Sequence, residues 1–151
     1  MKRFEFRLEG VLRHRRRVEK KGQILLGGAR EKAAREARSL EEANAAAAEA
    51  REELRRKASV GEIDVASARQ QRRHIGALAE RVRGMTRRLS ALESEVGRRR
   101  EEAVQAQRDR KALETLRARR HAVHVRKSAS AEQKELDDLS AKRAWTRGNG
   151  S

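Results

Sequence analysis

Residues 75–113 read IGALAERVRGMTRRLSALESEVGRRREEAVQAQRDRKAL, and this stretch decides the fold. Apolar residues recur in it at the two positions of a seven-residue repeat that form a coiled-coil seam. One position holds Ile75, Val82, Leu89, Val96 and Ala103, and the other holds Leu78, Met85, Leu92, Ala106 and Leu113, with Arg99 as the exception. Because a disordered chain would not sustain this spacing, the stretch predicts a long helix that packs on another helix.

A second helical face precedes this stretch, and its apolar residues are mostly Ala. They recur about every 3.6 residues, as on one side of a helix. The series is Leu8, Val11, Val18, Leu25, Ala29, Ala33, Ala37, Leu40, Ala43, Ala47, Ala50, Leu54 and Ala58. Arg15 and Gly22 interrupt it. Gly22 and the pair at 27–28 each cost about 1 kcal/mol inside a helix, so we expect a soft spot there.

A short connector separates the two periodic halves. Gly61 can adopt the left-handed conformation that ends a helix. Asp64, three residues before Ser67, is a plausible N-cap for the next helix. A connector this short joins antiparallel neighbours, so paired residue numbers should sum to about 122. Leu40 should then lie near Val82 or Met85.

The expected fold class is all-α: a long two-helix antiparallel coiled-coil hairpin with a C-terminal helical overhang, forming a single domain over residues 1–151. The first helix should span about 5–58, the turn about 59–63, the second helix about 64–145, and a frayed tail 146–151. The last 30 residues or so of the second helix have no internal partner, and the spacing slips beyond Leu113 as at a stutter. We expect a monomer when free, with an opened chain that dimerises as straight helices as the alternative.

The composition excludes most other classes of protein. Of 151 residues, 41% are charged and 2% are aromatic, with no Tyr, Pro or Cys. The chain therefore lacks the large apolar residues that a compact globular domain needs. The absence of Cys excludes disulfides and thiolate zinc sites. No run of 18 apolar residues occurs, and the charged N-terminus lacks the apolar stretch of a signal peptide. We therefore expect a soluble, cytosolic protein.

Of the formal net charge of +16, about ten charges should gather at the open end of the hairpin, where residues 1–21 lie beside residues 101–127. Residues 1–21 carry nine Lys or Arg against three acids, and residues 101–127 carry eight against four. Such a surface is either a solvated helix face or a docking site for an acidic partner. Nucleic acid is the alternative partner, which would make the chain a basic nucleic-acid- or ribosome-associated coiled coil. Interleaved acids and the lack of stacking aromatics argue against it.

No catalytic arrangement is visible in the sequence. His121 and His124 lie one helical turn apart, a spacing that could hold a metal, but the nearest acid is Glu114. We interpret both histidines as solvated residues of the overhang. We expect no enzyme activity, no cofactor, no metal and no small-molecule substrate.

Two end segments resemble a known family. Residues 4–13, FEFRLEGVLR, resemble the opening of the flagellar export protein FliJ family, and residues 110–116 with 132–138 are similar to its C-terminal signature. The resemblance implies a soluble part of the type III export apparatus that serves flagellum assembly, motility and chemotaxis. Such proteins sit in the centre of the export ATPase hexamer, bind the export-gate membrane protein, escort export chaperones and associate peripherally with the cytoplasmic face of the inner membrane at the flagellar base.

The resemblance also suggests site residues. It places a gate-binding surface at His74, Leu78, Arg81 and Met85, although the family has an aromatic residue at the first position and a small one at the third. Leu78 and Met85 are equally well explained as seam residues. We expect the ATPase ring to contact a tip that is apolar at its seam and basic around its rim, made by Phe4, Phe6, Leu8, Arg13, Arg15, Arg16, Arg17, Arg117, Arg119 and Arg120.

Overall fold

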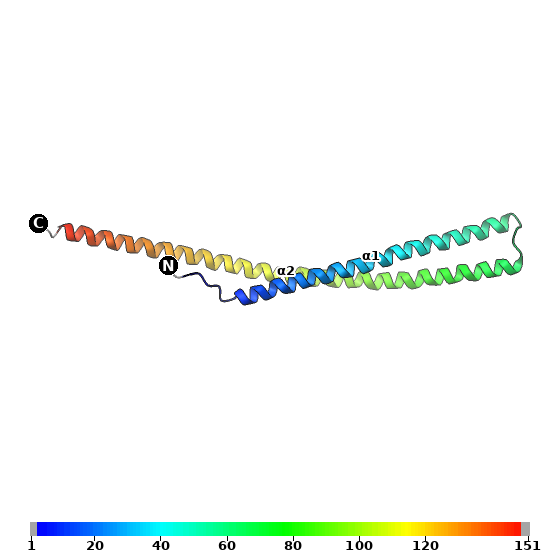
Figure 1. The fold of residues 1–151 in the computed structure, drawn as a ribbon, viewed down its shortest axis with the longest axis horizontal. Coiled ribbons are helices and arrows are strands. Elements are labelled where there is room, and N and C mark those ends of the chain that lie inside the picture. The colour runs from blue at the N-terminus through cyan, green and yellow to red at the C-terminus, as the bar shows by residue number, and fades with distance from the viewer. Residues whose placement is uncertain (1–2, 149–151) are drawn as a thin grey trace. The chain divides into compact units, whose positions relative to one another are not determined.

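The computed structural model describes residues 3–148 and contains two long helices (Figure 1). Helix α1 spans Glu9–Ser59 and helix α2 spans Val65–Gly148. No strand occurs among the described residues. The prediction of an all-α fold built from two long antiparallel helices is therefore confirmed.

The chain enters α1 through an extended segment, so the expected helix start at about residue 5 is wrong by four residues. The Phe6 carbonyl accepts a hydrogen bond from the Glu9 N–H at 2.9 Å, which closes the turn before α1. Residues two apart point to the same side of an extended chain but about 200° apart on a helix. The extended form lets Phe4 and Phe6 both contact α2, and a helix would have separated them.

The connector has the predicted caps. Gly61 has a φ of 71°, and the Glu62 N–H donates to the Lys57 carbonyl at 3.2 Å, which ends α1. The Asp64 carboxylate accepts the Ser67 N–H at 2.7 Å and caps α2, and this bond lowers the pKa of Asp64. Helix α2 continues to Gly148, three residues past the expected end. Residues 149–151 of the expected frayed tail lie outside the described residues.

The glycines of α1 do not interrupt the helix. At Gly22, an added Cβ would lie 3.6 Å from the Cα of Ala103, so two small residues face each other where the helices approach closely. At Gly27 and Gly28, an added Cβ would meet no atom within 4 Å. The helix is therefore continuous where a soft spot was expected, and Gly27 and Gly28 are exposed on its surface.

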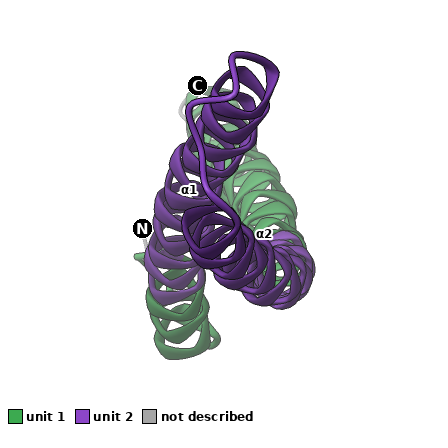
Figure 2. Cartoon of the chain, turned by 90° about the vertical axis from the view of Figure 1, so that its right-hand side faces the viewer, with its two compact units in different colours: residues 1–19, 105–151 green, residues 20–104 purple. Residues whose placement is uncertain are grey.

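The helices contribute to two compact units, which Figure 2 colours separately. Unit 1 comprises residues 1–19 and 105–151, and unit 2 comprises residues 20–104. In unit 1 Arg15 pairs with Asp109, and in unit 2 Glu36 pairs with Arg88. In both pairs the residue numbers sum to 124, close to the expected 122, so each unit contains antiparallel segments of α1 and α2. The expectation of a single domain stays a prediction.

The buried face of α1 differs from the predicted one between Val11 and Leu25, and also at Ala37 and Ala58, which are exposed. Val11, Val18 and Leu25 are 44%, 37% and 39% exposed. The buried and half-buried positions follow a strict heptad instead, through Leu8, Leu12, Arg15, Glu19, Gly22, Leu26, Ala29, Ala33, Glu36, Leu40, Ala43, Ala47, Ala50, Leu54 and Lys57. The two apparent interruptions, Arg15 and Gly22, belong to the seam itself. Of the polar seam residues, Arg15, Glu19 and Glu36 have partners on α2. Lys57 pairs instead with Glu53 of α1.

The predicted seam of α2 is confirmed. Every residue of the two predicted heptad positions between Ile75 and Leu113 is buried or half-buried, and Arg99 is half-buried among them. Beyond the paired region, residues 129–148 are exposed on every side. These residues form the predicted overhang, which is called the overhang below.

Candidate partner-binding surfaces

The first candidate surface is the end of unit 1 where the chain begins, called the basic tip below. It comprises residues 3–19 of the lead-in and α1 together with residues 105–124 of α2. Its interior is small and apolar: Leu12 is fully buried, and Phe6 is 8% exposed. Burial of these side chains holds the extended lead-in against α2.

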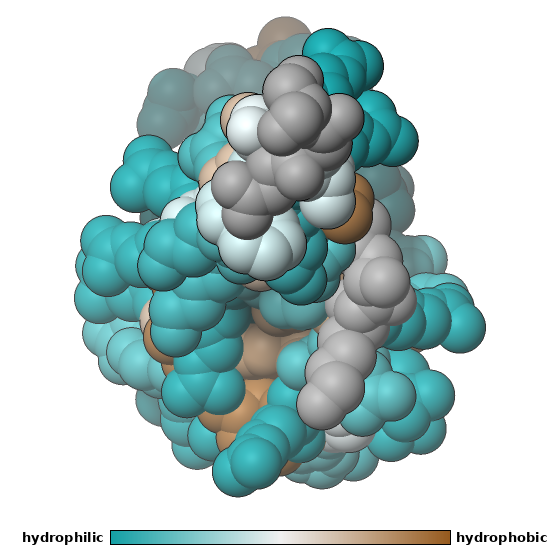
Figure 3. Space-filling view, turned by 90° about the vertical axis from the view of Figure 1, so that its left-hand side faces the viewer, coloured by the Kyte–Doolittle hydropathy of each residue, from teal (hydrophilic) through white to brown (hydrophobic). Residues whose placement is uncertain are grey.

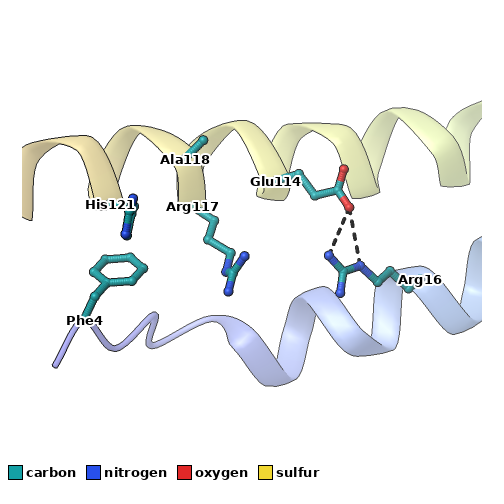
Figure 4. Close-up of a pocket in the computed structure, with 6 residues that line it drawn as sticks. All are labelled: Phe4, Arg16, Glu114, Arg117, Ala118 and His121. Atoms are coloured by element: carbon teal, nitrogen blue, oxygen red, sulfur yellow. Dashed lines mark hydrogen bonds and ion pairs between the residues drawn. The ribbon is translucent and has the colours of Figure 1, made fainter. Parts of the chain in front are cut away.

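Aromatic contacts fix the lead-in to α2. The Phe4 ring meets the His121 ring edge-on, with the ring centres 5.0 Å apart (Figure 4). The centre of the His124 ring lies 5.6 Å from that of Phe4. The Arg120 guanidinium lies 5.8 Å from the centre of the Phe6 ring, within the range of a cation–π contact. His121 is exposed as expected, although it also contacts the Phe4 ring, whereas His124 is half-buried, so its interpretation as a solvated residue is wrong. Their signal in the sequence was the spacing of His121 and His124 opposite an N-terminal aromatic.

Three of the predicted rim arginines form ion pairs between the helices. Arg15 pairs with Asp109 at 3.1 Å, Arg16 with Glu114 at 3.2 Å, and Arg117 with Glu9 at 3.0 Å. Their side chains are between 43% and 48% exposed. Half-exposed pairs of this kind add little stability individually but fix which residues face each other. These arginines are structural as well as surface residues.

A buried polar layer lies behind these pairs. The Arg110 guanidinium donates to both oxygens of Glu19, at 2.5 and 3.1 Å, and to Glu114 at 2.6 Å. The hydrogen bonds that Arg110 donates to Glu19 and Glu114 raise the pKa of Arg110. The hydrogen bonds that Glu114 accepts from Arg110, and then from Arg16, lower the pKa of Glu114. Sequence reasoning missed this layer. Its signal was a pair of opposite charges, Glu19 and Arg110, at seam positions of the two helices.

Three other predicted rim arginines add accessible charge to the basic tip. Arg13, Arg17 and Arg119 are exposed, and within residues 3–148 none of them forms an ion pair. The basic tip also has a hollow of about 430 Å³, lined by Phe4, Arg16, Glu114, Arg117, Ala118 and His121 (Figure 4). Phe4 and Ala118 supply its apolar part, and its two arginines are already paired with Glu114 and Glu9. The predicted tip residues therefore lie together, but their roles divide between seam and surface.

The second candidate surface, called the gate edge below, lies along α2 in unit 2. His74 and Arg81 are exposed, Leu78 is half-buried, and Met85 is 3% exposed. Leu78 and Arg81 line a groove of about 210 Å³ with Ser39, Glu42, Ala43 and Ala46. His74 lines a separate groove of about 490 Å³ next to the connector. A partner can reach His74, Arg81 and part of Leu78, whereas Met85 supports the seam beneath them.

Other kinds of site are absent from the part of the chain that is described. Among residues 3–148, no three His, Cys, Asp or Glu side chains gather as they would around a metal ion. Neither helix has, within the same residues, a stretch that is long and apolar enough to cross a membrane. Hydrophilic side chains cover most of the face shown in Figure 3, with smaller apolar areas recessed between them. The described surface therefore consists of helix faces and the shallow grooves between them.

Comparison with known proteins identifies a family for the chain. No curated protein and no solved structure gave a match. A family model, described as the flagellar FliJ protein, matches residues 4–149, which is nearly the whole chain. The resemblance of the end segments is thereby confirmed. The chain belongs to the FliJ family, whose members are coiled-coil components of flagellar protein export.

Proposed function

We propose that the chain acts in flagellar export by inserting its basic tip into the ring of the export ATPase and promoting the assembly of its hexamer. The observation that carries this proposal is that some arginines of the tip pair within the chain while others are exposed. Leu12 and the ion pairs of Arg15 and Arg16 hold the two helices together. Arg13, Arg17 and Arg119 are left to face a partner.

The binding expected from such a tip is collective. An exposed ion pair contributes about 0–1 kcal/mol, so three arginines give modest affinity that salt weakens. A surface of this kind can rest on acidic or carbonyl-rich loops without a fixed register. That property suits a stalk inside a ring of repeated subunits.

The test reverses only the arginines that have no structural partner. The variant Arg13→Glu, Arg17→Glu and Arg119→Glu should lose most of its stimulation of the purified ATPase, while circular dichroism shows unchanged helicity. A matched control, Arg30→Glu, Lys32→Glu and Arg51→Glu, makes the same charge change at exposed sites of unit 2. It should stimulate as well as the wild-type chain. Equal stimulation by both variants would show that the tip charge only solubilises the protein.

We further propose that the gate edge binds the cytoplasmic part of the export-gate protein. The exposure of His74 and Arg81 beside the groove at Leu78 supports this assignment. His74→Ala with Arg81→Ala should weaken binding in calorimetry, whereas Arg73→Ala with Arg87→Ala, at exposed positions of the same helix, should not. Met85→Ala should instead cost about 2 kcal/mol of folding stability, because it removes a buried side chain. If the two double variants bind the gate protein equally well, the gate-binding surface lies elsewhere on the chain.

The same proposal includes escort of export chaperones and attachment to the inner membrane through the gate protein. The unpartnered helical surfaces support protein binding of this kind. Pull-down of a chaperone by the wild-type chain, lost on truncation of the overhang, would assign the chaperone to that segment. Retention after truncation would assign it to the paired region.

A further inference from the structure

The overhang has an unused coiled-coil seam. Leu136 and Leu139 are 59% and 53% exposed, and Val125, just before the overhang, is 46% exposed. Steps of four, three, four and three residues lead from Val125 through Ala129 and Glu132 to Leu136 and Leu139. This alternation is the heptad spacing of a seam, and it continues at Arg143 and Thr146.

This seam does not extend the contact line that α2 makes with α1. The heptad that contains Arg110, Leu113 and His124 continues at Ala131, whereas the exposed seam passes through Glu132. An offset of one residue rotates a helix face by about 100°. A partner on the exposed seam would therefore lie beside the line of α1 and would not compete with it.

The order of charges along the seam indicates which partner fits. Glu132 lies in the seam and Glu135 flanks it, then come the two leucines, then Lys142 flanks the seam and Arg143 lies in it. Within residues 3–148, none of these four charged side chains forms an ion pair. The acids precede the leucines and the bases follow them. When two copies of this segment run antiparallel, the acids of each copy therefore lie opposite the bases of the other.

We propose that the overhang binds the overhang of a second copy of this chain, in antiparallel orientation. With Leu136 opposite Leu139 of the second copy, Glu132 lies opposite its Arg143, and Glu135 lies beside its Lys142. Two-fold symmetry repeats every contact, so each pairing of an acid with a base occurs twice, once at each end of the contact. Parallel pairing would place Glu132 against Glu132 and Arg143 against Arg143, which like-charge repulsion disfavours.

The contact is short, and its strength follows from that. It spans the seam from Ala129 to Thr146, with the four leucines of the two copies as its only large apolar side chains. Stable interfaces need about 800 Å² from each partner, and so few layers fall short of that. The dimer is therefore weak, forming at high protein concentration and yielding to any partner that offers a longer seam.

The test uses full-length chains in sedimentation equilibrium at low salt, from micromolar to near-millimolar concentration. One variant carries Glu132→Arg with Glu135→Lys, and the other carries Lys142→Glu with Arg143→Glu. The weight-average mass of the wild-type chain should rise with concentration. Each variant alone should associate about tenfold more weakly, because every opposite-charge layer becomes a like-charge layer. The two variants mixed in equal amounts should associate like the wild type, because both layers are then matched again.

Trp145 serves as an internal control. It is 70% exposed and lies nine residues, or about half a turn in rotation, from Leu136. Its fluorescence should not shift as the dimer forms. A wild-type chain that stays monomeric throughout, or variants that associate as well alone as when mixed, would overturn the proposal. A blue shift of Trp145 that accompanies association would do the same, by placing the contact on the opposite face.

Discussion

At the scale of single residues, the polar layer shows how charge substitutes for apolar contact in this seam. Glu19 and Arg110 occupy positions where a coiled coil normally holds Leu, and their side chains are 11% and 20% exposed. An unpaired charge at such a place is costly, and a paired one is close to neutral. The layer therefore specifies which residues face each other more than it stabilises the pairing.

Substitution of this layer should separate the two effects. Glu19→Ala should lower the urea midpoint of unfolding, because Arg110 loses its two-oxygen partner. Glu19→Leu combined with Arg110→Leu should restore that midpoint or raise it, because apolar residues at these positions need no charge partner. The m-value should stay constant in both variants. A double variant less stable than Glu19→Ala would show that the ion pair itself stabilises the fold.

At the scale of one helix, α1 continues through two glycines, which disfavour helix formation. Gly27 and Gly28 lie in its interior with open space where a Cβ would stand. Each Gly→Ala change there should raise the free energy of unfolding by about 1 kcal/mol, through helix propensity alone. Urea denaturation checks the effect, and Gly61→Ala is the contrasting change. It should destabilise, because a φ of 71° strains any residue that carries a Cβ.

Element by element, the sequence predicted most where large apolar residues mark the seam. The heptads of α2 from Ile75 to Leu113 were correct at every predicted position. The face of α1 failed between Val11 and Leu25 because apolar residues there lie one position beside the seam, where hydrophobicity alone selects the wrong side. No local rule could reveal that Glu19 has Arg110 opposite it, since that contact joins residues 91 positions apart.

At the scale of the whole molecule, acid should loosen the pairing at the basic tip. Arg110, and then Arg16, hold the pKa of Glu114 below its usual 4.5. A lowered folded-state pKa gives stability that is present above the unfolded value and lost as pH falls through the folded one. Helicity measured in urea should therefore decrease below about pH 4.5, and Glu114→Gln should reduce this dependence. An unchanged acid profile for Glu114→Gln would remove Glu114 as its source.

The sequence predicted which residues lie together at the basic tip, but not which of them contact α2. The sequence places the arginines of the tip near one another, and the structure shows Arg15 and Arg16 turned to partners on α2 while Arg13 and Arg17 remain exposed. Neighbours along a helix point about 100° apart, so a run of arginines is always divided in this way. Which arginines face α2 depends on which positions of the heptad form the seam. The sequence predicted the wrong positions in this part of α1, so it could not identify those arginines.

The strict heptad spacing of α1 constrains how the gene can change in length. Loss of one codon between Leu8 and Lys57 would rotate every later side chain by about 100° relative to α2 and turn the seam away from its partner. Loss of seven codons keeps the face but shifts the register, unless α2 loses the matching seven. Related genes should therefore differ in length by paired heptads, one in each half, at equal distances from the codon for Gly61.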